Sequence, residues 1–372
     1  MEPLYKLDML AVSLNLYEFI GETKTTLSKK NVILFRILNW LILCVALSYI
    51  IINFFYIEGE YYVKTLQSMF YLSQPLLKYI LLAKQKPTIQ GMLWDMLTKS
   101  WKYRYFGERI TKRTEGIHKI VRYTQVSMII GSVIALNVYL LRPLVVSTSG
   151  MPLESYIPQS VVMDAIVMLS HFYSIWLAII TVIGYDFIYV SSCIYVILQL
   201  RLVKLRMRQA LNNFNETSTS VLHQCIKHHQ FLLSIFFCMR NVYSVLLLYH
   251  YLTTLVSTCT VILQLFLRQS DAATYAVNII GIIFLISQFA LYTFPAEQVA
   301  TEFLDISNAI YISKWYQNNK ETQTLVLFVM MKSQQRLYFT GAGLVDINAE
   351  AFEAVVRKSF SFGAIVKNLL QI

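Results

Sequence analysis

Residues 348–372 read NAEAFEAVVRKSFSFGAIVKNLLQI, and this stretch constrains the fold more than any other part of the chain. It is long enough for one helix across the hydrocarbon core of a bilayer, which takes about 20 residues. Spacings of three and four residues place one set of side chains on a single face of that helix. The set consists of Lys358, Ser361, Ile365, Asn368, Leu369 and Ile372. Polar groups at membrane depth lie against protein or water, so this face lines either a pore or the interior of a helix bundle.

The composition of the whole chain is that of a membrane protein. The 372 residues are 56% hydrophobic and 14% charged, with a mean hydropathy of +0.52. Soluble domains carry about 25% charged residues. We therefore predict an all-α membrane protein with seven transmembrane helices. The predicted spans are Val32–Ile57, Val63–Leu82, Thr124–Leu141, Val161–Leu198, Phe231–Leu267, Ala272–Phe294 and Asn348–Leu370. The fourth and fifth are too long for one crossing, so we expect both to extend into the cytosol.

Basic residues are distributed unequally between the connecting segments. Residues 83–120 and 199–230 are rich in lysine and arginine, whereas the loops on the other side contain only Arg142 and Arg268. Because lysine and arginine collect on the cytosolic side of a membrane, the N-terminus is predicted to be cytosolic and the C-terminus extracellular. The net charge of +11 is thus assigned to orientation, and no nucleic-acid partner is expected.

The spans divide the chain into four functional segments. We predict a cytosolic N-terminal segment (1–30), a six-helix membrane bundle with a ligand pocket (31–294), a cytosolic anchor and subunit-interface region (295–347), and a pore-lining seventh helix (348–372). Pro295 is expected to close the sixth helix, because the residue before a proline disfavours helical geometry. A turn is expected at residues 341–343.

The anchor region contains one strongly apolar helix, predicted at Thr322–Leu337. A cytosolic helix of this kind needs a surface to bury against, which is either a neighbouring subunit or another part of the same chain. The side chains expected to make this contact are Leu325, Phe328, Met331 and Gln335.

Aromatic and polar side chains recur at one depth in the outer half of four predicted spans. A cavity lined in this way would hold a small, mostly apolar molecule. The alternative is that these side chains are bundle core or belong to the aromatic belt at the membrane interface. The candidate ligand-binding residues are Phe70, Tyr71, Gln74, Ala135, Tyr139, His171, Tyr173, Trp176, Tyr275, Asn278 and Ile279.

Signals for catalysis and for cofactors are weak. The sequence has no phosphate-binding glycine-rich loop and no nucleophile elbow. Asp164 and Asp186, the carboxylates of the long fourth span, have no evident catalytic partner. The histidines near Cys225 lack the paired spacing of a structural zinc site. We predict no catalytic residues, no metal and no cofactor, which argues against an enzyme.

Several motifs in the last third of the chain resemble the insect odorant receptor family. They are Ala309-Ile310-Tyr311, Trp315-Tyr316, Phe339-Thr340-Gly341-Ala342-Gly343, Phe352 and Ser359-Phe360-Ser361-Phe362. Two departures are visible, since Arg336-Leu337 stands where a proline is common and phenylalanines replace two tyrosines of the last motif. The co-receptor of that family is longer in the second cytosolic loop, so the chain looks like a ligand-tuning subunit.

The resemblance implies a heterotetrameric, odorant-gated, non-selective cation channel in the plasma membrane, formed with the co-receptor. It implies that Thr322–Leu337 is a central anchor and that the final helix lines the pore. By position, Ile365 and Leu369 would form a hydrophobic gate, with Ser361 and Asn368 on the same helix. The odorant pocket of the family lies among the second, third, fourth and sixth helices. A metabotropic seven-helix chemoreceptor, a gustatory-type receptor channel and a transporter are the alternatives.

Overall fold

The structure, a computed structural model, is almost entirely helical. It describes residues 29–56, 61–145, 153, 156, 160–213, 217–267 and 272–369, so the predicted N-terminal segment 1–30 falls almost wholly outside the described residues. The helices are α2 (Lys29–Tyr56), α3 (Tyr61–Lys99), α4 (Glu108–Val145), α5 (Val161–Asn212), α6 (Thr217–Leu267), α7 (Ala272–Tyr311), α8 (Lys320–Ser333) and α9 (Ala349–Leu369). Two 3₁₀ helices, η2 (Tyr103–Phe106) and η3 (Trp315–Gln317), lie in connections. The predicted all-α class is confirmed.

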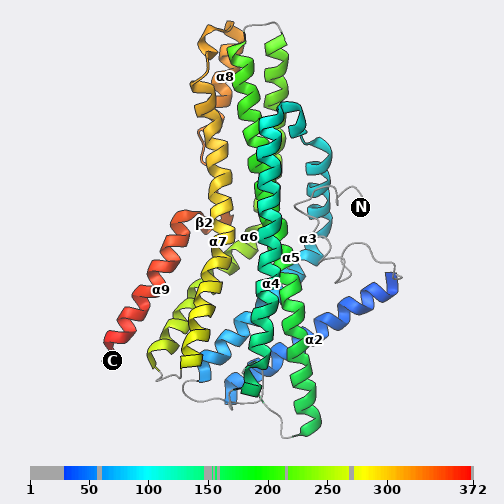
Figure 1. Cartoon of the computed structure of the whole chain (residues 1–372), viewed down its shortest axis with the longest axis vertical. Helices are drawn as coiled ribbons and strands as arrows, with labels where there is room; N and C mark the ends of the chain where they lie inside the picture. Colours follow the sequence, from blue (N-terminus) through cyan, green and yellow to red (C-terminus); the bar gives the residue numbers. More distant parts are fainter. Residues whose placement is uncertain are drawn as a thin grey trace.

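Helices α4, α5, α6 and α7 run roughly along the long axis of the molecule, whereas α2 and α3 cross it obliquely (Figure 1). The upper half contains α8 and the ends of α5, α6 and α7 that lie near it, and these helices pack side by side. The lower half contains α9 and α2, and here the helices diverge. The region around α8 is called the upper half, and the region around α9 and α2 is called the lower half.

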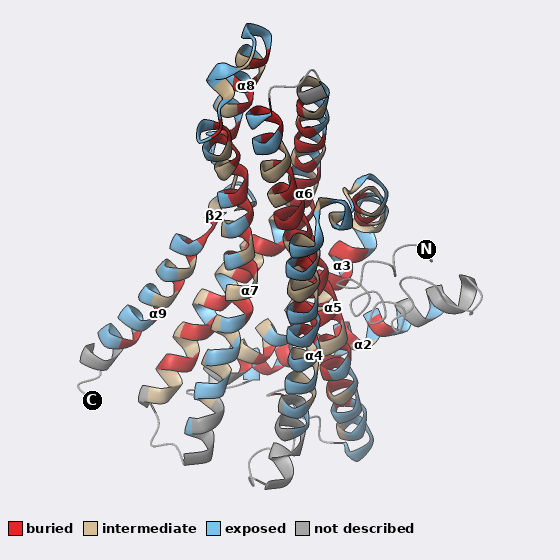
Figure 2. Cartoon of the chain, turned by 45° about the horizontal axis from the view of Figure 1, so that its top comes forward, coloured by how far each residue is buried: buried red, intermediate tan, exposed pale blue. Residues whose placement is uncertain are grey.

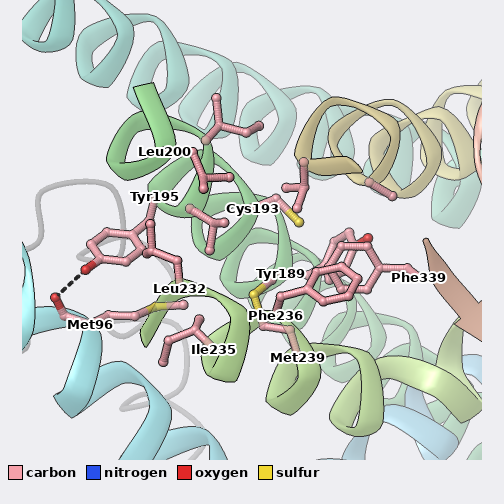
Figure 3. Packing of buried hydrophobic residues seen from close by; sticks show 14 of the residues in the cluster. Met96, Tyr189, Cys193, Tyr195, Leu200, Leu232, Ile235, Phe236, Met239 and Phe339 are labelled. Atoms are coloured by element: carbon pink, nitrogen blue, oxygen red, sulfur yellow. Dashed lines mark hydrogen bonds between the residues drawn. The ribbon is translucent and has the colours of Figure 1, made fainter. Parts of the chain in front are cut away.

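The hydrophobic core is concentrated in the upper half. There α5 is buried on nearly all sides between Tyr185 and Leu200, as expected for a helix segment that is apolar around its whole circumference. At its centre the Tyr189 ring lies 4.8 Å from that of Tyr243, and the Phe236 ring lies 4.9 Å from that of Phe339 (Figure 3). Fully burying one such side chain contributes about 1.5–3 kcal/mol. This core fixes the positions of the helices that continue into the lower half.

A small β-ribbon connects the upper core to α9. Strands β1 (Phe339–Gly341) and β2 (Val345–Ile347) pair antiparallel, with Phe339 opposite Ile347. The predicted turn is confirmed, and it places Ala342 (φ 49°) and Gly343 (φ 73°) in the left-handed region. A Cβ on Gly341 would lie 3.0 Å from backbone atoms of Leu248, so only glycine lets the ribbon approach α6 this closely.

Two hydrogen bonds donated by backbone amides then fix where α9 begins. The Ala342 amide donates to the backbone carbonyl of Ser244 at 3.1 Å, which ties the ribbon to α6. The Asn348 side chain accepts a hydrogen bond from the Ala351 amide at 2.8 Å and caps the first turn of α9. The predicted last helix, Asn348–Leu370, is therefore reproduced to within one residue at each end by Ala349–Leu369.

Three helices run further than the sequence predicts, among them α4, which begins at Glu108 rather than at Thr124. Pro295 does not close α7, which continues to Tyr311 with the proline inside it. A proline removes one helical hydrogen bond, and burial of Ala296, Val299 and Phe303 in the upper core outweighs that loss. Likewise α3 passes Pro87 and ends at Lys99 rather than at the predicted Leu82. The predicted boundary at 294 thus falls inside one continuous helix.

The predicted anchor helix is shorter at its C-terminal end than expected. Helix α8 ends at Ser333, so the prediction that it reaches Leu337 is wrong and Gln335 lies beyond it. The chain must leave the helix early because Phe339 enters the core as the first residue of β1. At its other end, the Asn319 side chain caps α8 by accepting from the Thr322 amide at 2.8 Å.

Four stretches of the described residues are long and apolar enough to cross a membrane by length and composition. They are Ile37–Tyr56, Val161–Asn212, Thr219–Leu265 and Asn278–Tyr311. The described parts of α3, α4 and α9 include no such stretch, so the crossings of these helices stay predictions.

Candidate functional site

The predicted ligand-binding residues lie in the lower half and do not all face inward. On α3, Phe70 and Gln74 are partly buried. On α5, His171 is completely buried, whereas Tyr173 and Trp176 are 36% and 40% exposed. Tyr275 and Ile279 of α7 are also exposed, and Tyr71 is exposed on α3. Asn278 is partly buried, and the side chains of Ala135 and Tyr139 lie outside what the structure describes.

Two of these residues contact α6, a helix that the sequence did not assign to the pocket. Gln74 Nε2 lies 3.5 Å from His250 Nε2. The Tyr249 hydroxyl lies 2.6 Å from the Ser73 hydroxyl and 3.3 Å from the carbonyl of Phe70. Tyr173 instead donates to Asn39 Oδ1 of α2 at 2.5 Å. The described contacts therefore separate the α3 residues, which meet α6, from Tyr173, which faces α2.

His171 is the most unusual member of the predicted set. Its residue is 0% exposed, yet neither ring nitrogen has a hydrogen-bond partner within the described part of the chain. Ser174, one turn further along the same face of α5, has a buried hydroxyl that also finds no partner there. Buried polar groups in proteins are nearly always paired. An imidazole can both donate and accept, so this face offers hydrogen bonds to a small polar group.

A buried polar cluster joins α3, α5 and α7, and it contains partners of Asp186 that the sequence alone did not reveal. Lys78 of α3 and Asp186 of α5 form an ion pair, and both side chains are almost completely buried. Tyr292 of α7 donates its hydroxyl to the same carboxylate, and Gln288 Nε2 donates to Asp186 Oδ2 at 3.1 Å. The sequence contained one signal for this pair, which is that Lys78 stands alone in an apolar run. A charge at membrane depth requires a partner.

Helix α9 presents two different sides (Figure 2). The buried side consists of Ala351, Val355, Ser359 and Gly363, spaced four residues apart, and the helix packs chiefly against α6. Phe352 also reaches α7, where its ring lies 5.1 Å from that of Phe294 and 6.3 Å from that of Phe289. The small buried side chains let the two helices approach closely.

The exposed side of α9 carries charge. It includes Glu353 and Arg357, joined at 3.2 Å, together with Lys358, Ser361 and Ile365. The side chains of Asn368 and Leu369 lie outside the described residues. Such a face cannot lie against lipid tails at low cost, so it suits water or another protein chain.

Helix α8 divides the predicted anchor contacts between two faces. Val326 and Val329 are buried, and Leu325 packs against the upper core, so one face is covered by the same chain. Phe328 and Met331 are each 65% exposed. An exposed apolar patch is typical of an interface with another subunit. The same-chain interpretation therefore holds for one face, and a contact with a neighbouring subunit stays a prediction for the other.

The chain is similar in sequence to receptors of insects. A protein-family model described as 7tm Odorant receptor matches residues 99–360. Odorant receptor 22c of Drosophila melanogaster is 23% identical over 172 residues, which are 42% of this chain and 42% of that protein. The Odorant receptor coreceptor of Harpegnathos saltator is 24% identical over 138 residues, 37% of this chain and 29% of that protein. The matched parts thus span less than half of these relatives.

The fold is similar to a solved structure over nearly the whole chain. The insect olfactory receptor OR5 from Machilis hrabei in complex with eugenol superposes with a TM-score of 0.84 at 15% identity, covering 97% of each chain. Another structure of that receptor gives a TM-score of 0.81 at 14% identity, covering 96% of each chain. At these identities the likeness establishes the arrangement of the helices.

Proposed function

Because the chain belongs to the odorant receptor family, we propose that it is a ligand-tuning subunit of an odorant-gated, non-selective cation channel. In this proposal it assembles with the odorant co-receptor as a heterotetramer in the plasma membrane. The lower half spans the bilayer, and the upper half, which holds the lysine- and arginine-rich segments 83–120 and 199–230, lies in the cytosol.

The observation that carries the proposal is the exposed side of α9. Lys358 and Ser361 lie on it, opposite the small residues that pack against α6. A helix of the membrane half with a charged outer face must border water or protein, and four such helices around an axis would enclose an aqueous path. Ile365 lies two turns beyond Lys358 on the same face. We place the gate at Ile365 and Leu369, with Asn368 beside them.

The proposed ligand is a small volatile molecule that binds in the membrane half. Apolar burial contributes about 25 cal/mol per Å2, so a molecule of about ten heavy atoms reaches micromolar affinity without a charge. Phe70 and Gln74 are the described α3 candidates for this site, and His171 is the α5 candidate. A ligand that fits the open state better than the closed state shifts the population toward open channels.

The cytosolic contact between subunits is proposed at α8. Phe328 and Met331 form its exposed apolar face, with Leu327 beside them. Burying this face against the same region of neighbouring subunits would gather the upper halves around one axis. The lower halves of the subunits, which differ between this chain and the co-receptor, would then be arranged around the same axis.

The test is electrical recording from cells that express this chain with and without the co-receptor, against a panel of alcohols, esters and aromatic volatiles that includes eugenol. We expect current within milliseconds of application, only when both chains are present. A response that needs a diffusible second messenger would instead support the metabotropic alternative. An epitope at the N-terminus that is accessible in intact cells would contradict the proposed orientation.

A further inference from the structure

The buried ion pair between Lys78 and Asp186 lies where the helices of the upper half begin to diverge. Lys78 is 0% exposed and Asp186 is 4% exposed. The ring of His250 on α6 lies 4.4 Å from that of Tyr292, whose hydroxyl meets Asp186. Four helices, α3, α5, α6 and α7, therefore meet at one polar cluster.

This α3–α5 pair differs from the ion-pair network that joins α5 to α7. In the upper half, Glu302 of α7 is itself buried and accepts from Arg201 at 2.6 Å and from Lys204 at 2.5 Å, but both cations remain partly exposed. A pair whose cations stay in contact with water tolerates small movements, because water replaces part of a lost contact. A fully buried pair does not, since removing one partner leaves a charge in an apolar interior. The Lys78 cluster is thus the contact between these helices that movement disturbs most.

Contacts extend from the cluster toward both functional regions. Gln74 lies one turn before Lys78 on α3 and reaches His250 at 3.5 Å, which connects the cluster with the proposed ligand site. On α7, Phe289 and Phe294 flank Tyr292 along the helix and meet Phe352 in the first turn of α9. The same short segment of α7 therefore contacts Asp186 on one side and the proposed pore helix on another.

We propose that Lys78, Asp186 and Tyr292 act together as a positioning element that holds α7, and through it α9, in the resting closed state. The inference rests on the proposed channel function and adds a regulatory site to it. A ligand beside Gln74 that displaces α3 relative to α7 must rearrange the hydrogen bonds of Asp186. The buried pair makes that rearrangement all-or-none, so the cluster gives α7 two discrete positions rather than a continuous range.

The test uses the full chain with the co-receptor and two variants. Tyr292→Phe removes one hydrogen bond to Asp186 and keeps the ring against His250. The double variant Lys78→Met/Asp186→Leu removes both charges, so neither is left unpaired. For both we expect higher ligand-free current per surface receptor and an EC50 lowered about fivefold or more, which is the low end of typical coupling effects. The probe is the first compound of the volatile panel that activates the wild-type pair.

Glu302→Gln is the matched control, because it weakens the link between the same two helices in the upper half. We expect its EC50 and ligand-free current to match the wild type. If Tyr292→Phe and the double variant reach the surface with unchanged EC50 and unchanged ligand-free current, the inference is wrong while the channel function stands. A raised EC50 also overturns it, because the cluster would then favour the open state. If the wild-type pair conducts no current with any compound, the proposed function fails first and the inference falls with it.

Discussion

The two halves of α5 show how differently the upper and lower regions of the molecule are built. Between Tyr185 and Leu200 almost every side chain is buried within the chain itself. Between Val161 and Trp176 large apolar side chains face outward, with Val161 87% and Leu169 68% exposed. One helix thus passes from a core completed by its own chain to a region that depends on lipid or neighbouring chains.

Buried polar groups without a recorded partner among the described residues occur in both halves, for example Ser333 of α8 and His171 of α5. In the upper half, Gln199 accepts from the Trp101 amide at 3.1 Å, donates to the Trp101 carbonyl at 3.1 Å and lies 2.9 Å from His228 Nε2. In the lower half, His171 and Ser174 are buried and lack a partner among the described residues. An imidazole can both donate and accept, so His171 is the member of this group best suited to a ligand with a polar atom.

The largest expected effect comes from opening the upper core. Phe339→Ala removes a fully buried ring from the junction of β1, α5 and α6, and should destabilise the fold by about 3–5 kcal/mol. The measurement is the midpoint of thermal unfolding of the detergent-purified protein. Leu169→Ala in the exposed lower part of α5 is the matched control. Losing an exposed side chain costs only a few tenths of a kcal/mol, so the unfolding midpoint of this variant should stay within about 1 °C of the wild type. Equal losses for the two variants would erase the distinction between the halves.

A second effect tests whether the lower half gates a pore. Ile365→Asp places a charge at the proposed constriction and should wet it, raising ligand-free current about tenfold or more when the chain is expressed with the co-receptor. Ile365→Val keeps the site apolar and should leave the ligand-free current near the wild-type level. Unchanged conductance and rectification in a well-expressed Ile365→Asp variant would remove Ile365 from the pore wall.

For the lower half, the sequence predicted the positions of the helices better than the contacts between them. Hydropathy located the helices, and the three- and four-residue spacing in α9 selected Lys358, Ser361 and Ile365, which are exposed as are Phe360 and Phe362 outside that set. These signals are local, so a single stretch contains them. The Lys78–Asp186 pair joins residues 108 positions apart, and no periodicity reports such a contact.

In the upper half, the sequence predicted the helix ends wrongly. Pro87 and Pro295 favour helix ends when only local propensity is considered, yet both lie inside continuous helices. Tertiary packing decides, because each helix gains a buried face in the upper core that local sequence cannot reveal. The early end of α8 has the same origin, since Phe339 is drawn into that core.

A third, smaller effect would sharpen the comparison of polar groups. His171→Phe removes the unpaired imidazole and fills its volume with an apolar ring. Losing one hydrogen bond to a buried group costs about 1–3 kcal/mol. The EC50 for a ligand that uses His171, such as an alcohol or ketone, should therefore rise about tenfold, while that for a hydrocarbon of the same shape should not. Dose–response curves for such matched pairs provide the measurement, and a parallel shift for both compounds would mean that His171 serves only packing.

The smallest effect concerns the charge on α9. Arg357 is neutralised by Glu353 at 3.2 Å, whereas Lys358 adds a positive charge to the exposed side without a recorded ion-pair partner among the described residues. A fixed cation beside a cation path repels divalent ions more than monovalent ones, because the Coulomb energy scales with ion charge. Lys358→Gln should thus raise the permeability of calcium relative to sodium, about twofold given screening by water and by the other subunits. Reversal potentials in calcium and sodium solutions measure that ratio. The control is the double variant Glu353→Gln/Arg357→Gln, which removes one charge of each sign and should leave the permeability ratio unchanged. An equal shift in the control and in Lys358→Gln would show that the ratio responds to the helix surface as a whole and not to Lys358.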